Sequence, residues 1–206
     1  MSKREERRGE RRATILETAG ECFFDKGYAG TTMSAVAARL GGSKGTLWNY
    51  FSSKEDLFAA CIEDKTQAFR AELVSVLNPA APLRVAIEGF CRSFAAKIRT
   101  APSIALYQLL CGEAARAPEA SRIFFERGPA VVEALLTAFL GGHVEAGRLR
   151  NGAPLEMAHV LISLCTGVSH QRMLLGLVPV GAVPACLAPD RIADLFFRLY
   201  AAETEV

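Results

Sequence analysis

The sequence is poor in the residues that build metal sites and most enzyme active sites. Its 206 residues include three histidines and one tryptophan. It has no defensible Ser/His/Asp order, no phosphate loop and no dinucleotide fingerprint. None of its cysteines are spaced as Cys-x-x-Cys (Cys22, Cys61, Cys91, Cys111, Cys165 and Cys186). We therefore expect no enzyme, no metal and no cofactor, and we expect small, buried cysteines in a reducing cytoplasm.

The sequence also lacks a strong excess of one charge and an uninterrupted apolar run. The formal net charge is only +2, which excludes a polycationic protein that coats DNA but leaves room for a local basic surface. The most apolar run, 157–178, is interrupted by His159, His170 and Arg172, so we interpret it as a buried helix. The charged N-terminal residues do not resemble a secretory signal. We expect a cytoplasmic protein without a membrane partner.

Apolar residues recur at helical spacing throughout the chain, and no stretch alternates as a strand would. Glycine and proline separate the apolar segments. The sequence therefore predicts an all-α fold of nine helices or so, and the segments that can form them number ten. A first helix ends at Gly27, and the others are expected at 33–40, 44–51, 53–77, 83–100, 103–117, 119–127, 128–140, 154–177 and 190–203.

The stretch 31–58 has the pattern of a helix-turn-helix. Thr32 can cap a first helix, and Gly41 with Gly42 can adopt the positive φ that ends it. Ser43 can then cap a second helix, and Ser53 a third. Two short helices joined by a glycine turn are typical of DNA-binding proteins, in which the second helix enters the major groove.

The second helix of this pair carries side chains suited to DNA. Leu47 and Phe51 form its inward stripe. Asn49 can pair with adenine, and Thr46 can contact a phosphate or a thymine methyl group. The residues expected to contact DNA are Thr32, Ser43, Lys44, Gly45, Thr46, Trp48, Asn49, Tyr50 and Lys54. The basic segment 3–12 precedes them and could reach a phosphate or a minor groove, or could be a solvated helix start.

This ordered pattern resembles the DNA-binding domain of TetR/AcrR-family transcriptional regulators. The resemblance rests on Thr31-Thr32, Val36-Ala37, Gly41, Ser43 to Leu47, Tyr50-Phe51 and Ser53 to Phe58. The segment 83–177 is similar to the AefR-like C-terminal domain found in some of these proteins. The resemblance implies a helix-turn-helix domain at 1–52 and a helical ligand-binding and dimerisation domain at 53–206. A linker helix at 53–77 would join them.

Two sites are expected in the larger domain. Aromatic and apolar residues with few polar partners could form a pocket for a small hydrophobic effector, although ordinary core packing is the more common explanation for each of them. These residues are Phe90, Phe94, Tyr107, Gln108, Cys111, Phe124, Cys165 and His170. The last two helices are apolar on more than one face, which favours a homodimer over a thick monomer core. The interface residues would be Leu161, Leu164, Val168, Ile192, Leu195, Phe196 and Leu199.

The favoured function is a homodimeric transcriptional regulator, most often a repressor in this family. It would bind a palindromic operator in double-stranded DNA and leave it when the effector binds. The alternative is a DNA-binding protein of the same fold that acts in chromosome organisation or division without a small ligand.

Overall fold

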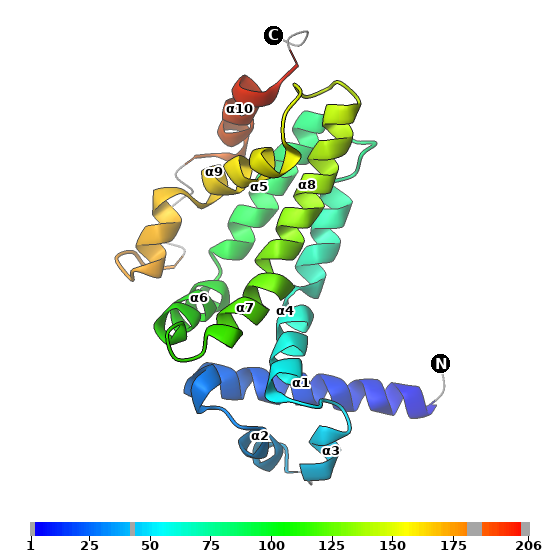
Figure 1. Cartoon of the computed structure of the whole chain (residues 1–206), viewed down its shortest axis with the longest axis vertical. Helices are drawn as coiled ribbons and strands as arrows, with labels where there is room; N and C mark the ends of the chain where they lie inside the picture. Colours follow the sequence, from blue (N-terminus) through cyan, green and yellow to red (C-terminus); the bar gives the residue numbers. More distant parts are fainter. Residues whose placement is uncertain (1–2, 42–43, 181–186, 203–206) are drawn as a thin grey trace. The chain divides into compact units, whose positions relative to one another are not determined.

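The computed structural model describes residues 3–41, 44–180 and 187–202. These residues form ten α-helices and no strand, apart from one isolated bridge between Leu149 and Ala201 (Figure 1). The all-α prediction is confirmed. The helices are α1 (Lys3–Gly30), α2 (Met33–Arg39), α3 (Lys44–Trp48), α4 (Lys54–Val76), α5 (Leu83–Ile98), α6 (Ala101–Glu113), α7 (Pro118–Arg127), α8 (Pro129–Glu145), α9 (Pro154–Leu174) and α10 (Pro189–Tyr200).

These helices group into two compact units. The first unit combines residues 1–67 with 108–129, and the second combines 68–107 with 130–206. Helices α4 and α6 each contribute residues to both units. The sequence predicts a domain boundary at residue 53, between the helix-turn-helix and the larger domain. The two compact units instead divide inside α4 and inside α6.

Three aromatic rings hold the centre of the first unit. The Phe58 ring of α4 meets Phe23 edge-on with 5.0 Å between ring centroids, and meets Tyr28 at 5.1 Å. Phe23 and Tyr28 stack at 5.8 Å. Leu16 and Leu57 are also fully buried here. Because edge-to-face aromatic packing is directional, it fixes the orientation of α4 against α1 as well as burying apolar area.

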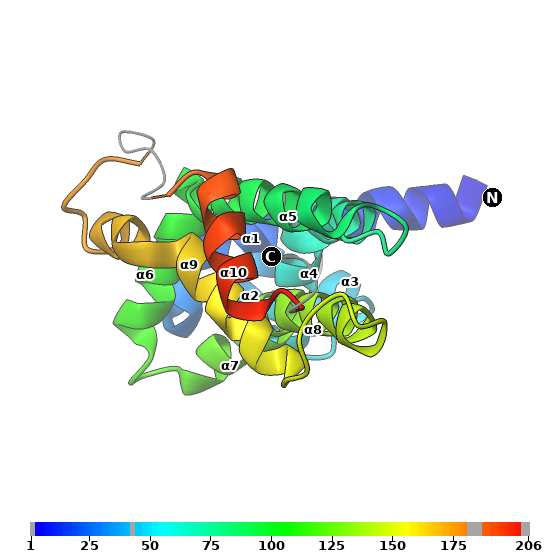
Figure 2. The same cartoon turned by 90° about the horizontal axis from the view of Figure 1, so that it is seen from above.

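The second unit is built around a larger apolar core. Helices α5, α9 and α10 pack against one another, which Figure 2 shows from above. Phe90, Leu136 and Phe196 have no exposed surface, and Leu73 of α4 joins the same cluster. Helix α10 buries Ile192, Ala193, Phe196 and Tyr200 on one side, whereas its sequence pattern predicts apolar residues on more than one face.

The structure corrects the prediction of one long helix at 154–177. At Gly167, φ is 55° and ψ is −173°, so α9 breaks there, and the ribbon changes direction between its yellow and orange parts (Figure 1). The helix then ends at Leu174, shortly before Gly176 with φ 69°. Apolar composition alone cannot reveal such a break, because both halves remain partly buried.

The end of α8 and the exposure of Cys111 also differ from what the sequence predicts. Helix α8 continues through Gly141 and Gly142 to Glu145, so the prediction that it ends near 140 is wrong. Cys111 is exposed, which contradicts its expected burial, whereas Cys22, Cys61, Cys91 and Cys165 are buried as predicted. Cys186 lies outside the described residues. None of the helices in the described ranges has the length and apolar character needed to cross a membrane.

Candidate nucleic-acid interface

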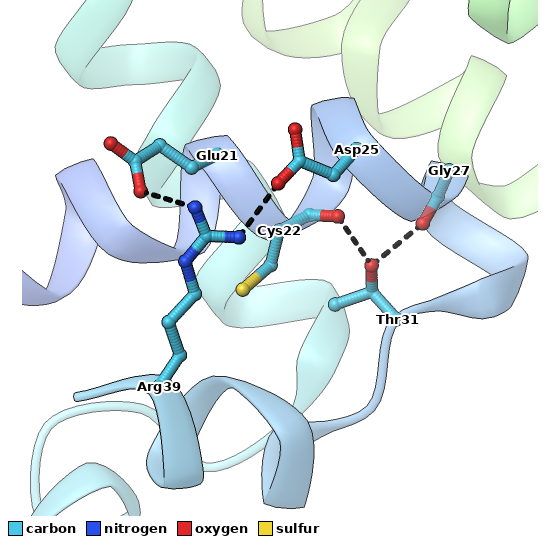
Figure 3. Close-up of polar contacts among 6 residues, drawn as sticks. All are labelled: Glu21, Cys22, Asp25, Gly27, Thr31 and Arg39. Carbon is cyan, nitrogen blue, oxygen red and sulfur yellow. Dashed lines mark hydrogen bonds and ion pairs between the residues drawn. The ribbon is translucent and has the colours of Figure 1, made fainter. Parts of the chain in front are cut away.

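The interface candidate begins at the cap of α2. The Thr32 side chain accepts a hydrogen bond of 3.1 Å from the backbone N–H of Ala35, so the predicted N-cap is confirmed. The neighbouring Thr31 is buried, and its hydroxyl lies 2.7 Å from the Gly27 carbonyl and 3.0 Å from the Cys22 carbonyl. Figure 3 shows these contacts, which tie the start of α2 to the end of α1.

An arginine makes a second connection between the same two helices. The Arg39 guanidinium of α2 reaches Asp25 at 2.7 Å and Glu21 at 2.9 Å, both on α1 (Figure 3). All three side chains are exposed, so solvent screening limits what they add to stability. The fork geometry of the guanidinium nevertheless restricts how α2 can rotate on α1. No local signal in the sequence reveals this contact, because the residues lie 14 and 18 positions apart.

The glycine turn leads into α3. Gly41 has φ 64°, the left-handed conformation expected of it. Gly42 and Ser43 lie outside the described residues, as does the side chain of Lys44. Helix α3 ends at Trp48, one turn short of the predicted end at 51. Its hydrogen-bond pattern still persists, since the Phe51 N–H donates to the Leu47 carbonyl at 3.0 Å.

Helix α3 has one buried and one exposed side. Leu47 and Phe51 are buried with 1% and 6% of their surface exposed, as predicted. Trp48 is 44% exposed, and Asn49 and Gly45 are also exposed. Thr46 and Tyr50 are half-buried. A large indole and a carboxamide in solvent on a short helix are available to a partner, which is the arrangement a groove-reading helix requires.

Lys54, the last predicted DNA contact, is held by Tyr28. Its ammonium donates to the Tyr28 carbonyl at 3.1 Å and lies 4.0 Å from the centroid of the Tyr28 ring. The Tyr28 hydroxyl donates to Glu55 at 3.0 Å. Burial, and then this carboxylate, raise the pKa of Tyr28 well above its usual range. An ammonium has three donor hydrogens, so the contact with Tyr28 leaves Lys54 able to bind a phosphate as well.

A glycine and a carboxylate stabilise the bend at the end of α1. At Gly27, φ is 73° and ψ is 169°, so the predicted break is confirmed even though helical structure resumes up to Gly30. A Cβ at Gly27 would collide with a carboxylate oxygen of Glu113. Glu113 also accepts a 2.7 Å hydrogen bond from the backbone N–H of Tyr28. The carboxylate therefore fills the space that only glycine leaves open.

The basic start of α1 lies beside the end of α3. A hollow of about 410 Å³ is lined by Arg4, Arg7, Arg8, Asn49 and Tyr50. Arg8 lies 6.0 Å from the centroid of the Tyr50 ring, and Arg12 lies 5.6 Å from that of Phe51. The sequence places the basic segment next to the helix-turn-helix along the chain but does not show which side chains meet.

The residues predicted to line an effector pocket divide between the two units. Gln108, Cys111 and Phe124 belong to the first unit, and the other five belong to the second. Phe90 and Phe94 stack with centroids 5.4 Å apart and belong to the apolar core, as does Cys165. Core packing therefore accounts for these three residues.

Tyr107 and His170 form a more polar pair within the second unit. Their rings meet edge-on with centroids 6.0 Å apart. His170 is 7% exposed, and its Nδ1 has no hydrogen-bond partner among the described residues. Burial, and then the positive charge of Arg99, lower the pKa of His170.

The structure corrects three of the seven expected interface residues. Leu161, Ile192 and Phe196 are at most 2% exposed and pack in the core of their own unit, so a partner chain cannot reach them. Val168 and Leu199 are 57% and 44% exposed, and Leu164 and Leu195 are half-buried. No group of three or more His, Cys, Asp or Glu side chains in the described parts of the chain is arranged to hold a metal ion.

Two family models match this chain and together cover most of it. The model for bacterial regulatory proteins of the tetR family matches residues 15–61. The model for the AefR-like transcriptional repressor C-terminal domain matches residues 86–202, more than half of the chain. The first match contains α2 and α3, and the second begins in α5 and runs through α10.

Individual transcriptional regulators are also similar to this chain in sequence or in structure. The transcriptional repressor AcnR of Corynebacterium glutamicum is 27% identical over 171 residues, covering 79% of this chain and 86% of AcnR. The transcriptional activator FasR of Mycolicibacterium smegmatis is 36% identical over 87 residues, which is only 40% of its length. The solved structure of the flavonoid-responsive regulator FrrA superposes with a TM-score of 0.80 and 27% identity, covering 95% of this chain and 99% of FrrA. The chain therefore belongs to the tetR family of bacterial regulatory proteins and is a DNA-binding transcriptional regulator.

Proposed function

We propose that this protein is a homodimeric repressor that binds a palindromic operator through α3 and leaves it when a small hydrophobic effector binds. The observation that carries the proposal is the exposed side of α3, with Trp48 and Asn49 in solvent and Leu47 buried behind them. Gly45 at the start of α3 allows a DNA backbone to approach closely. Because the protein acts on operator DNA, we expect it in the cytoplasm.

Repression is favoured over activation by the extent of the similarities. The match to the repressor AcnR runs through 79% of this chain, whereas the match to the activator FasR covers 40% of it. A repressor needs only to occupy the operator, so a helix-turn-helix and a dimer suffice for it. In vitro transcription from the promoter beside the gene separates the two modes, since an activator would increase the transcript.

A dimer follows from the geometry of operator DNA. One copy of α3 reads one half-site, and two copies related by a two-fold axis read a palindrome. The exposed apolar residues Val168 and Leu199 support an interface formed by α9 and α10. Leu164 and Leu195, half-buried in the single chain, would complete their burial there. Burying exposed apolar surface is the main driving force for such association.

The effector is proposed to be a flat, mostly apolar molecule with few polar groups. FrrA, similar over almost its whole length, responds to flavonoids, which makes this class the first to test. In the second unit, the Tyr107 ring and the unpartnered Nδ1 of His170 can stack on and hydrogen-bond to a phenolic ring. Gln108, Cys111 and Phe124 remain predicted pocket residues without further support.

The proposed function is tested by measuring operator binding and then the loss of operator binding when an effector is added. Labelled fragments of the non-coding DNA beside the gene are titrated with the purified protein, and fluorescence anisotropy reports binding. We expect one palindromic fragment to bind at least about a thousandfold more tightly than a scrambled fragment. Equal affinity for both fragments would contradict sequence-specific regulation.

A flavonoid series is then added to the bound complex. A hundredfold loss of operator affinity corresponds to about 2.7 kcal/mol of coupling between the two sites, within the usual allosteric range. Coupling is reciprocal, so operator DNA must weaken flavonoid binding by the same factor, which calorimetry with and without operator measures. Flavonoid binding that is unaffected by operator would remove the effector proposal and leave DNA binding intact.

A further inference from the structure

The start of α1 is a rigid, positively charged helix rather than an extended arm. Residues from Lys3 onward are helical, and α1 places Arg4, Arg7 and Arg8 on one side because they are spaced three and four residues apart. Figure 1 shows this half of α1 running beside α3. A helix is too wide for the minor groove, which is about 6 Å across in B-form DNA. The helical conformation therefore argues against minor-groove insertion and for contact with the phosphate backbone.

The hollow between α1 and α3 offers several donors to one anion. Arg4, Arg7 and Arg8 line one side of it, and Asn49 and Tyr50 line the other. All three arginine side chains are exposed, and the structure records no ion pair for them in the described residues. A guanidinium binds phosphate through two parallel N–H groups, and a phenol donates one more hydrogen bond. The hollow thus has the composition of a phosphate site.

Aromatic rings hold two arginines of α1, Arg8 and Arg12, next to the end of α3. The Arg8 guanidinium lies 6.0 Å from the centroid of Tyr50, and Arg12 lies 5.6 Å from that of Phe51. Cation–π contacts of this kind orient a flexible side chain before a ligand arrives. Because Tyr50 directly follows Asn49, a phosphate in the hollow would lie immediately next to the bases that α3 reads.

We propose that this hollow, defined by Arg4, Arg7, Arg8, Asn49 and Tyr50, is a binding site for one DNA backbone phosphate that flanks each half-site. This inference rests on the proposed operator binding. In this arrangement Arg4 and Arg7 neutralise the phosphate, Tyr50 donates through its hydroxyl, and Arg8 stacks on the Tyr50 ring. The site adds affinity and fixes the register of α3, but it carries no sequence information itself.

The first test is the salt dependence of operator binding. Each neutralised phosphate contributes about 0.9 to the slope of log K against log salt. In the double variant Arg4→Gln/Arg7→Gln, the slope should fall by about one per half-site, with about a fivefold loss of affinity per contact at 0.15 M salt. The preference for operator over scrambled DNA should stay within twofold of the wild type. The matched control Arg92→Gln/Arg116→Gln removes two exposed charges that neither line the hollow nor lie on α9 or α10, and it should leave the slope unchanged.

The second test locates the phosphate. Single neutral methylphosphonate linkages are placed one at a time along the flanks of the operator. Wild-type protein should lose affinity at one linkage per half-site, and the Arg4→Gln/Arg7→Gln variant should show no further loss at that linkage. Tyr50→Phe should lose less than the double variant at the same linkage.

The outcomes separate this inference from the proposed function. Wild-type protein that binds no operator would overturn both. Specific wild-type binding with an unchanged slope in the double variant would overturn only the phosphate site. Equal loss in the variant and the control would mean that the arginines act only through net charge, which also overturns the site. The loss of affinity caused by the double variant and the loss caused by the neutral linkage could also simply add. The arginines would then bind another part of the DNA or another partner, which also overturns the phosphate site.

Discussion

Gly27 illustrates how one residue sets the end of α1. Its φ of 73° and ψ of 169° fall in a region that side chains with a Cβ rarely enter, and Glu113 occupies the space beside it. Gly41, by contrast, has a left-handed φ of 64°, and a Cβ added there would meet no atom of the described residues within 4 Å beyond its chain neighbours. A substitution at Gly41 therefore causes backbone strain alone, whereas a substitution at Gly27 causes both backbone strain and a steric conflict.

We expect Gly27→Ala to destabilise the protein more than Gly41→Ala. Backbone strain costs on the order of 1–3 kcal/mol at each position. Only at Gly27 does the methyl group also displace Glu113 and endanger its hydrogen bond with the Tyr28 amide. Urea denaturation of both variants measures the difference. Equal losses would show that Glu113 moves aside without cost.

Asn49 and Lys54 are expected to affect DNA binding in different ways. Asn49→Ala should cost about 1–3 kcal/mol and relax discrimination at one base position, because a base contact carries sequence information. Lys54→Ala should weaken binding to all sequences alike and lower the salt slope by about one. Anisotropy titrations against a set of single-base operator variants at several salt concentrations measure both. An unchanged base preference for Asn49→Ala, or an unchanged slope for Lys54→Ala, would remove that assignment.

At the scale of helices, α8 carries a buried histidine that makes stability depend on pH. His143 is 2% exposed, and its Nδ1 accepts a 2.7 Å hydrogen bond from Arg148. Burial, and then the positive charge of Arg148, lower the pKa of His143 below its usual range. The unfolded chain therefore binds a proton at His143 at a higher pH than the folded chain does. The stabilisation that this pKa shift provides is fully present above about pH 6.5, the usual pKa of a histidine in the unfolded chain. It is lost as the pH falls towards the lower pKa of His143 in the folded chain.

We predict that the free energy of unfolding decreases from pH 7 to pH 5. His170, whose pKa is lowered in the same direction, adds to the effect. A single proton contributes at most about 1.4 kcal/mol per pH unit. His143→Asn keeps a side-chain acceptor for Arg148 but cannot titrate, so its stability should depend less on pH. Denaturant unfolding at pH 5, 6 and 7 measures this, and identical pH profiles would contradict the prediction.

At the scale of the whole molecule, α10 has some apolar residues that pack in the core of its own chain and others that a dimer partner could cover. The sequence pattern of α10 predicts two apolar faces, but it does not say which face packs inside its own chain. The structure assigns Phe196 to the core with no exposed surface and leaves Leu199 44% exposed. These neighbouring residues of one helix therefore allow a direct comparison.

Leu199→Asp is predicted to separate the proposed dimer without unfolding the chain, because its charge would be buried only when a partner covers it. Phe196→Asp should unfold the second unit, because a charge cannot be solvated in its core. Analytical ultracentrifugation reports association, and far-ultraviolet circular dichroism reports folding. A Leu199→Asp variant that remains dimeric would move the interface elsewhere.

Sequence alone determined the features that depend on local chemistry. The capping role of Thr32, the positive φ of Gly41 and the break at Gly27 follow from what each residue can do with its own backbone. The burial of Leu47 and Phe51 follows from helical spacing. The all-α class and the family follow from many such local signals agreeing in order along the chain.

Tertiary structure decided everything that depends on contacts between distant positions. Arg39 joins Glu21 and Asp25, and Glu113 holds the Tyr28 amide across 85 residues, with no local signal for either contact. Whether Phe196 faces the core or a partner depends on which helices surround it. The hollow beside Asn49 exists only because α1 brings its arginines to the end of α3. Periodicity states that a face is apolar or charged, whereas packing selects what that face meets.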